Sequence, residues 1–175
     1  VDCLRSGYVE GALSMKVQET KIPGMMLVDL DVYRDTRGSF LECYQKERYK
    51  EHGIDVEFVQ DNHSHSTKNV LRGMHFQINH PQGHLVYVVR GDIFDVGVDI
   101  RRGSPTFGQW QGFRLSESRP QQLFLPAGVA HGFCTLSDKA DILYKCTDYF
   151  DSDDEGGLLW CDSDLKIDWP IDQPI

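Results

Sequence analysis

Short runs of β-branched and aromatic residues, broken by Gly, Pro, Asn and Asp, recur along most of the chain. Clear examples are MMLVDLDVY (25–33), HLVYVV (84–89), DIFDVGVDI (92–100), QQLFLP (121–126), HGFCTL (131–136) and DILYKCTDYF (141–150). Strands this short, with turn residues between them, predict an all-β fold, either a sandwich or a barrel. Helices should be few and short. The best candidate is YQKERYKEHG (44–53), where good helix formers precede a glycine.

The segment 92–100 shows what lies on each face of one expected strand. Because side chains alternate along a strand, Phe94, Val96, Val98 and Ile100 share one face, and Ile93, Asp95, Gly97 and Asp99 share the other. The first face is apolar and belongs to a core. The second carries two carboxylates, as expected of a solvated surface or of the polar lining of a barrel.

Length, composition and charge narrow the class of protein. The chain has 175 residues, of which 40% are hydrophobic and 26% charged, which is ordinary for one globular domain with a sizeable core. No apolar run approaches the roughly 20 residues that cross a bilayer, so no membrane partner is expected. A net charge of −9 argues against nucleic acid as a partner. It leaves room for an anionic small molecule held by a local basic cluster.

The N-terminal residues and the cysteines add expectations about processing and location. Residues 1–14 are nondescript, whereas Met15 begins MKVQETKIPG as a natural start would, so we interpret 1–14 as an N-terminal extension and 15–175 as a single domain. No secretion signal is evident, which makes a cytoplasmic location the default. The five cysteines are widely spaced and form no CxxC pair, a pattern typical of reduced thiols.

Three histidines are concentrated in LRGMHFQINHPQGHLVYVV (71–89): His75, His80 and His84. Strand histidines can be metal ligands, acid–base groups or simply hydrogen-bonded residues. A metal site is not expected, because the H-x-H pair His63 and His65 has no glutamate shortly after it and His75 has no second histidine at i+2. His80 lies in a turn-like NHPQG and is expected to be an exposed loop residue.

Several ordered motifs together indicate a family. LPAGVAHGF contains P-x-G-x-x-H, the pattern of the second cupin motif. With FVQDNHSHS, NVLRGMHFQ, FDVGVDIRRGSPTFGQW, LYKCTDYF and IDWP, it resembles the dTDP-4-dehydrorhamnose 3,5-epimerase family from about residue 17 to residue 170. The resemblance implies a cupin (jelly-roll β-barrel), no cofactor or metal, a homodimer, and a nucleoside-diphosphate 4-keto-6-deoxysugar as substrate.

Epimerisation beside a keto group needs a base on one face of the sugar, an acid on the other, and a stabilised enolate oxygen. The resemblance implies His75 as the base and Tyr144 as the opposing proton donor; histidine suits this task near neutral pH. It places His84 where relatives have a lysine, since QGHLV replaces QGKLV. A neutral imidazole would offer the enolate oxygen only a hydrogen bond. Either His84 substitutes for the lysine, or the substrate or the number of inverted centres differs.

The resemblance also implies a set of substrate-binding residues, mostly for the nucleotide. These are Arg37, Glu42, Gln60, Asp61, Asn62, Arg72, His131, Phe150 and Glu155. An arginine can hold two diphosphate oxygens with its rigid fork. Phe150 stands where relatives have a tyrosine that stacks on the base. Because Arg72 precedes His75 by three residues, regular alternation would separate them, and we expect a bulge at Gly73 to bring both to the site.

The support of the base and the exact activity both leave alternatives open. The sequence ends IDWPIDQPI, without the LSxKD-like segment whose aspartate supports the base in relatives. Asp95 or Asp99 is expected to take over that role, unless the chain has been shortened. Alternative functions are a sugar-nucleotide 3,4-ketoisomerase, which shares the cupin fold, and a catalytically weakened sugar-nucleotide-binding cupin.

Overall fold

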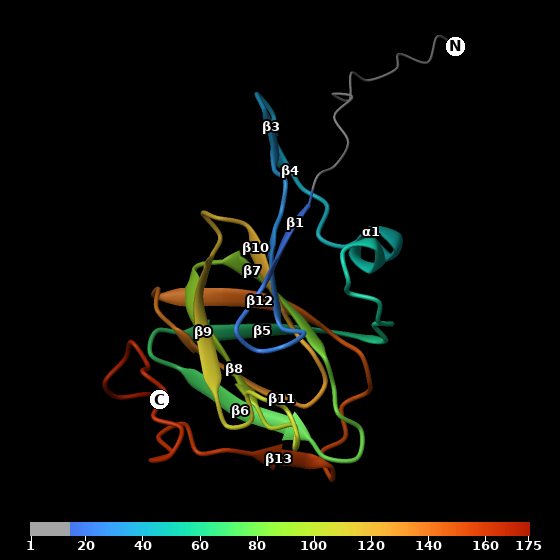
Figure 1. Ribbon diagram of the computed structural model, residues 1–175. Helices are drawn as coiled ribbons and strands as arrows, with labels where there is room; N and C mark the ends of the chain where they lie inside the picture. The colour runs from blue at the N-terminus through green and yellow to red at the C-terminus, as the bar shows by residue number, and fades with distance from the viewer. Residues whose placement is uncertain (1–14) are drawn as a thin grey trace.

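Two antiparallel sheets form a flattened barrel in the computed structural model, which describes residues 15–175 (Figure 1). The six-stranded sheet has the order β1 (Lys16–Glu19), β2 (Met26–Asp29), β10 (Gln121–Leu125), β7 (His84–Arg90), β12 (Lys139–Cys146), β5 (Gln60–Thr67). The five-stranded sheet has the order β13 (Glu155–Gly157), β6 (Leu71–Gln77), β11 (Val129–Thr135), β8 (Asp92–Asp99), β9 (Trp110–Ser116). This confirms the predicted all-β jelly-roll barrel. The proposed extension 1–14 lies outside the described residues.

A small hairpin and one short helix lie outside these sheets. The hairpin pairs β3 (Tyr33–Asp35) with β4 (Gly38–Phe40) and projects away from the barrel at the top of Figure 1. The helix α1 (Lys46–Glu51) is shorter than the predicted 44–53. The Gln45 side chain caps its first turn by accepting a hydrogen bond from the Arg48 amide, and His52 is its C-cap. It is the only α-helix in the described part of the chain.

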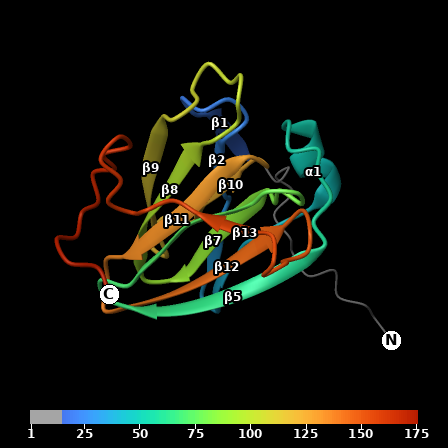
Figure 2. The same cartoon turned by 90° about the horizontal axis from the view of Figure 1, so that it is seen from below.

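The space between the sheets holds the central core. Alternate side chains of both sheets fill it, including Val86, Val88 and Ile142 from one sheet and Ile93, Leu115 and Val129 from the other. Each sheet is also covered on its outer face. Tyr49 of α1 packs with Leu85 and Phe124 over the six-stranded sheet, and the C-terminal segment packs over the five-stranded sheet, as Figure 2 shows.

The expected strand 92–100 is buried on both faces. Val96 and Val98 pack outward against Trp169 of the C-terminal segment, whereas Ile93 packs into the space between the sheets. Asp95 and Asp99 share the face of Ile93, and both are completely buried. Of the two possibilities for the polar face, lining of the barrel is therefore the one observed.

The expected irregularity at Gly73 is present. β6 pairs with β11 as His75 opposite His131 and Arg72 opposite Phe133, so two residues of β6 face Gly132 alone. Gly73 has φ 116°, and an added Cβ would lie 2.5 Å from the Gly132 Cα atom, so glycine is required here. The prediction of a bulge is confirmed, and it places Arg72 and His75 on the same, inner side of the strand.

Candidate active site

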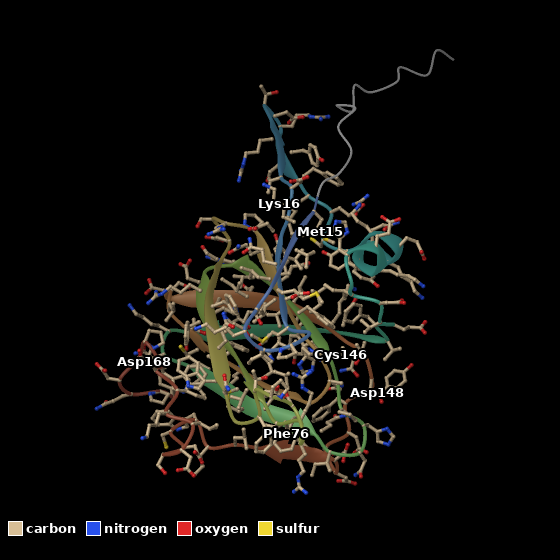
Figure 3. The ribbon with its side chains drawn as sticks, viewed as in Figure 1. Met15, Lys16, Phe76, Cys146, Asp148 and Asp168 are labelled. Atoms are coloured by element: carbon tan, nitrogen blue, oxygen red, sulfur yellow. The ribbon has the colours of Figure 1, made fainter. Side chains whose placement is uncertain are left out.

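Side chains from four strands meet inside the barrel. The rings of His84 (β7) and His131 (β11) are 5.4 Å apart between centroids, and His84 and Tyr144 (β12) are 5.8 Å apart with an edge-on geometry. His75 (β6) lies opposite His131 in the ladder. Figure 3 labels one residue on each of the two sheets that supply these side chains, Cys146 on β12 and Phe76 on β6. The structure therefore brings together all three predicted catalytic residues.

His131 is fixed by a buried carboxylate. Its Nε2 lies 3.0 and 3.1 Å from the two oxygens of Asp95, and the side chains are 10% and 0% exposed. An unpaired buried carboxylate would be costly, so this hydrogen bond also stabilises the fold. His131 was predicted to bind substrate. The structure places it deep in the barrel beside His84.

Neither carboxylate that was expected to support His75 does so. Asp95 is bonded to His131. Asp99 accepts hydrogen bonds from Arg101, Ser104 and Thr106, which hold the pKa of its carboxyl far below the usual range despite the opposing effect of burial. The expectation for Asp95 and Asp99 was wrong, because strand alternation gives the face of a residue but not its partner on the next strand.

His84 is a neutral residue in this site. Burial, with a further contribution from His131 and His75, lowers the pKa of its imidazole to about 3. Gln82 donates from Nε2 to the Asp148 carbonyl oxygen, 2.7 Å away, which turns its Oε1 toward His84 Nε2 at 3.3 Å. Because Oε1 can only accept, the imidazole proton lies on Nε2. The Nδ1 atom is buried and has no hydrogen-bond partner within residues 15–175.

Tyr144 is suited to donate a proton. Burial is the main cause that raises the pKa of its hydroxyl, and Cys146 and Glu155 act in the same direction. A hydrogen bond with Asn62 and the charge of Arg72 oppose this shift only in part. The hydroxyl is therefore protonated at neutral pH.

The predicted binding residues fall into two groups. The first group lines the inner side of β5 and β6 and the adjoining opening of the barrel, called the mouth below. Gln60 accepts from the Phe150 amide and donates to Asn62, and Arg72 Nε donates to Ser66 Oγ at 3.0 Å. Glu155 lies on β13, with its Oε1 3.8 Å from His75 Nδ1.

The second group lies apart from the barrel interior of the same chain. Arg37 is on the projecting hairpin and pairs with Asp35, and Glu42 pairs with Arg48 near α1. Asp61 alternates with Gln60 and Asn62, so it points to the outer face of the sheet, where it pairs with Lys145 at 2.9 Å. It borders an outer-face pocket of about 180 Å³ that Tyr87 and Gln122 also line.

The remaining histidines and the cysteines lie outside this group of catalytic candidates. His80 is in the loop before β7 with a side chain that is 62% exposed, as predicted. His63 and His65 point outward and share the Asp141 carboxylate. Cys43, Cys134, Cys146 and Cys161 are free thiols, and Cys3 lies outside the described residues.

Residues 15–175 lack two further features. No group of three or more His, Cys, Asp or Glu side chains is arranged to hold a metal ion. No helix in this part of the chain is both long and apolar enough to cross a membrane.

Comparison with known proteins identifies a family of related enzymes. The model of the dTDP-4-dehydrorhamnose 3,5-epimerase family matches residues 19–175. An enzyme of that name from Pseudomonas aeruginosa is 50% identical over 163 residues, which cover 92% of this chain and 90% of the relative. A dTDP-4-dehydrorhamnose 3-epimerase from Streptomyces niveus is 38% identical over 164 residues, covering 92% and 79% of the two chains.

A solved structure of a related enzyme is similar to this chain in both sequence and fold. The dTDP-6-deoxy-D-glucose-3,5-epimerase of Legionella pneumophila, in complex with dTDP-4-keto-L-rhamnose, superposes with a TM-score of 0.90 at 47% identity. The match covers 93% of this chain and 87% of that one. On this sequence and structural similarity, the chain belongs to the dTDP-4-dehydrorhamnose 3,5-epimerase family.

Proposed function

We propose that this epimerase acts on a nucleoside-diphosphate 4-keto-6-deoxyhexose and inverts C3, C5 or both. The observation that carries the proposal is the convergence of His75, His84, His131 and Tyr144 inside one barrel. Related proteins of known structure include one bound to dTDP-4-keto-L-rhamnose, which supports a sugar nucleotide as the class of substrate.

In the proposed reaction His75 removes a proton from the carbon beside the keto group, giving an enolate. Its side chain is 57% exposed, so a sugar that enters the mouth can reach it. Tyr144 returns a proton from the six-stranded sheet, on the opposite wall of the barrel, and this inverts the centre. The raised pKa of Tyr144 supports the role of donor, because the hydroxyl carries its proton at neutral pH.

His84 would act on the enolate oxygen through a hydrogen bond and not through a charge. Because its pKa is about 3, the imidazole is neutral at physiological pH. Its one N–H faces Gln82 across a long 3.3 Å contact, which a ligand oxygen could replace. The family resemblance implies a lysine at this place, so a neutral donor would depart from the family pattern.

The nucleotide would lie along β5 and the mouth of the barrel. Gln60, Asn62 and Arg72 face inward there, and the Phe150 ring, 53% exposed, is available to stack on a base. Arg37 lies on the projecting hairpin, where it pairs with Asp35, and Glu42 pairs with Arg48 of α1. They would complete the site of a second copy in a homodimer, as the projecting hairpin suggests.

The direct test of the reaction is incubation with dTDP-4-keto-6-deoxyglucose in deuterated water, followed by NMR at C3 and C5. The proposal expects deuterium at one or both positions in a product that keeps its 4-keto group. A 3-keto product would identify a ketoisomerase. Binding without any exchange would identify a sugar-nucleotide-binding protein.

The dimer has its own test. Light scattering should give twice the mass of the chain, and Arg37→Ala should raise KM while leaving the mass unchanged. A monomer with normal activity would overturn the proposal that the hairpin completes a partner's site.

A further inference from the structure

Gln82 is the hydrogen-bond partner of His84. It stands two residues before His84, at the entry to β7, with only a glycine between them. The Gln82 Oε1 atom lies 3.3 Å from His84 Nε2. The other ring nitrogen, Nδ1, is buried and has no partner within residues 15–175. Gln82 is therefore the group that decides which ring nitrogen of His84 carries the proton.

The other contacts of the His84 ring leave its proton undetermined. The ring centroid of His131 is 5.4 Å away at a tilt of 57°, and that of Tyr144 is 5.8 Å away in an edge-on arrangement. These are packing contacts between rings and not hydrogen bonds. They restrict where the imidazole lies, but they favour neither of its two neutral tautomers.

The direction of the Gln82 side-chain amide is set by the backbone. Its Nε2 donates to the carbonyl oxygen of Asp148 at 2.7 Å. A backbone carbonyl can only accept, so the NH2 group must face Asp148 and Oε1 must face His84. The reversed amide would set its own oxygen against that carbonyl and lose the bond. The Asp148 peptide thus determines that Gln82 presents an acceptor to the imidazole.

The segment that carries the Asp148 carbonyl is itself held by several hydrogen bonds. The Gly83 amide donates to Thr147 Oγ1 at 2.7 Å, and the Thr147 amide donates to the Gly83 carbonyl oxygen at 3.0 Å. Gln77 of β6 donates to the Tyr149 carbonyl oxygen at 3.2 Å and accepts from the Asp151 amide at 2.8 Å. These bonds fix the Asp148 peptide without involving His84.

We propose that Gln82 is a positioning residue for His84: it keeps the imidazole proton on Nε2, the nitrogen that serves the keto oxygen of the sugar. This rests on the proposed function, in which His84 donates a hydrogen bond to the enolate oxygen. The lysine implied by the family resemblance would carry three donors on one nitrogen. A neutral histidine carries one N–H, and only one tautomer has it on Nε2. A histidine at this position therefore needs a partner that a lysine does not.

A neutral amide suits this task better than a carboxylate would. Both can accept a hydrogen bond from Nε2. The charge of a carboxylate, however, would lie close to the oxygen on which negative charge develops, and it would oppose formation of the enolate. The contact between Gln82 and His84 is also long for an N–H···O bond, so an enolate oxygen, as a stronger acceptor, can take over the N–H.

Kinetics of Gln82→Met test the role in turnover. Methionine keeps the length of the side chain and removes both of its hydrogen bonds. We expect kcat to fall about 10-fold, as when outer partners of functional histidines are lost, with KM within about twofold of the parent. Thr147→Val is the matched control, because it removes a hydrogen bond between the same two segments and leaves Gln82 and His84 in contact. Its kcat should stay within about twofold of the parent.

A double-mutant cycle shows whether Gln82 acts through His84. In a His84→Ala background there is no imidazole to orient, so Gln82→Met should then change kcat by less than about twofold. An equal loss of kcat in both backgrounds would show that Gln82 acts on the fold or on the segment around Asp148, and it would overturn the proposal. An unchanged kcat in the single variant would overturn it as well.

A second measurement does not depend on turnover. In 15N-histidine NMR of the whole protein, the His84 signals are those lost in His84→Ala. The proton should lie on Nε2 in the parent and in Thr147→Val, and it should be distributed over both nitrogens in Gln82→Met. Gln82→Glu, which still accepts the bond, should keep a proton on Nε2.

The same single tautomer in the parent and in Gln82→Met would overturn the proposal. If the parent protein shows no exchange at C3 or C5, the proposed function fails, and the tautomer measurement still decides the role of Gln82.

Discussion

The deep interior and the mouth of the barrel hold histidines in opposite surroundings. In the interior, His131 is 10% exposed and bonded to a fully buried Asp95, and His84 is held neutral by burial. At the mouth, His75 is 57% exposed beside a half-exposed Glu155. The three histidines, on strands of two facing sheets, are therefore not interchangeable: burial holds the His84 imidazole neutral, a buried carboxylate fixes the position of His131, and His75 is left accessible to a substrate.

Removal of Asp95 is the strongest way to disturb the interior. Asp95→Ala leaves the His131 N–H buried without a partner and should lower the free energy of unfolding by about 3 kcal/mol. Urea denaturation measures this change. Asp95→Asn, whose amide oxygen still accepts from His131, should lose about 1 kcal/mol. Equal losses for the two variants would show that the hydrogen bond is unimportant.

The neutral state of His84 predicts a pH dependence of stability. Because its pKa is about 3 in the fold and near 6.5 when unfolded, the unfolded chain binds more protons between these values. Stability should therefore fall as pH drops below about 6.5, by at most about 1.4 kcal/mol per pH unit from this group. Unfolding at pH 7 and pH 5 should differ less in His84→Asn than in the parent. The same difference in both proteins would contradict the assigned neutral state.

Activity should be least sensitive to substitutions on the outer face of the six-stranded sheet. Asp61 points away from the barrel and pairs with Lys145 at an exposed position, where ion pairs contribute about 0–1 kcal/mol. Asp61→Asn should change kcat/KM by less than about twofold. A large loss of activity would mean that the site extends through the sheet edge or that a partner chain covers this face.

Much of the fold was predictable from local patterns. The main strands, a short helix within 44–53 and the division of 92–100 into an apolar and a polar face follow from local sequence patterns. The choice between a solvated surface and the barrel lining for the polar face did not. The bulge at Gly73 was predicted because Arg72 and His75 had to share a face, and the register confirms it. The outward direction of Asp61 was also available from the sequence, since it stands between Gln60 and Asn62 on one strand.

The pairing across strands was not predictable in the same way. Asp95 meets His131, and Glu155 approaches His75, only because of the registers of β8 with β11 and of β13 with β6. These registers depend on long-range packing. The depth of His84, which decides its charge, likewise depends on the neighbouring strands and not on its own motif.

The most direct test of the central claim, that His75 is the base, is site-resolved deuterium exchange with His75→Asn. Loss of a general base should slow exchange at C3 and C5 about 10²- to 10⁴-fold. The melting temperature should change little, because the side chain is half-exposed. Exchange at the parental rate in a folded His75→Asn protein would contradict the account and transfer the role of base to another residue of the barrel.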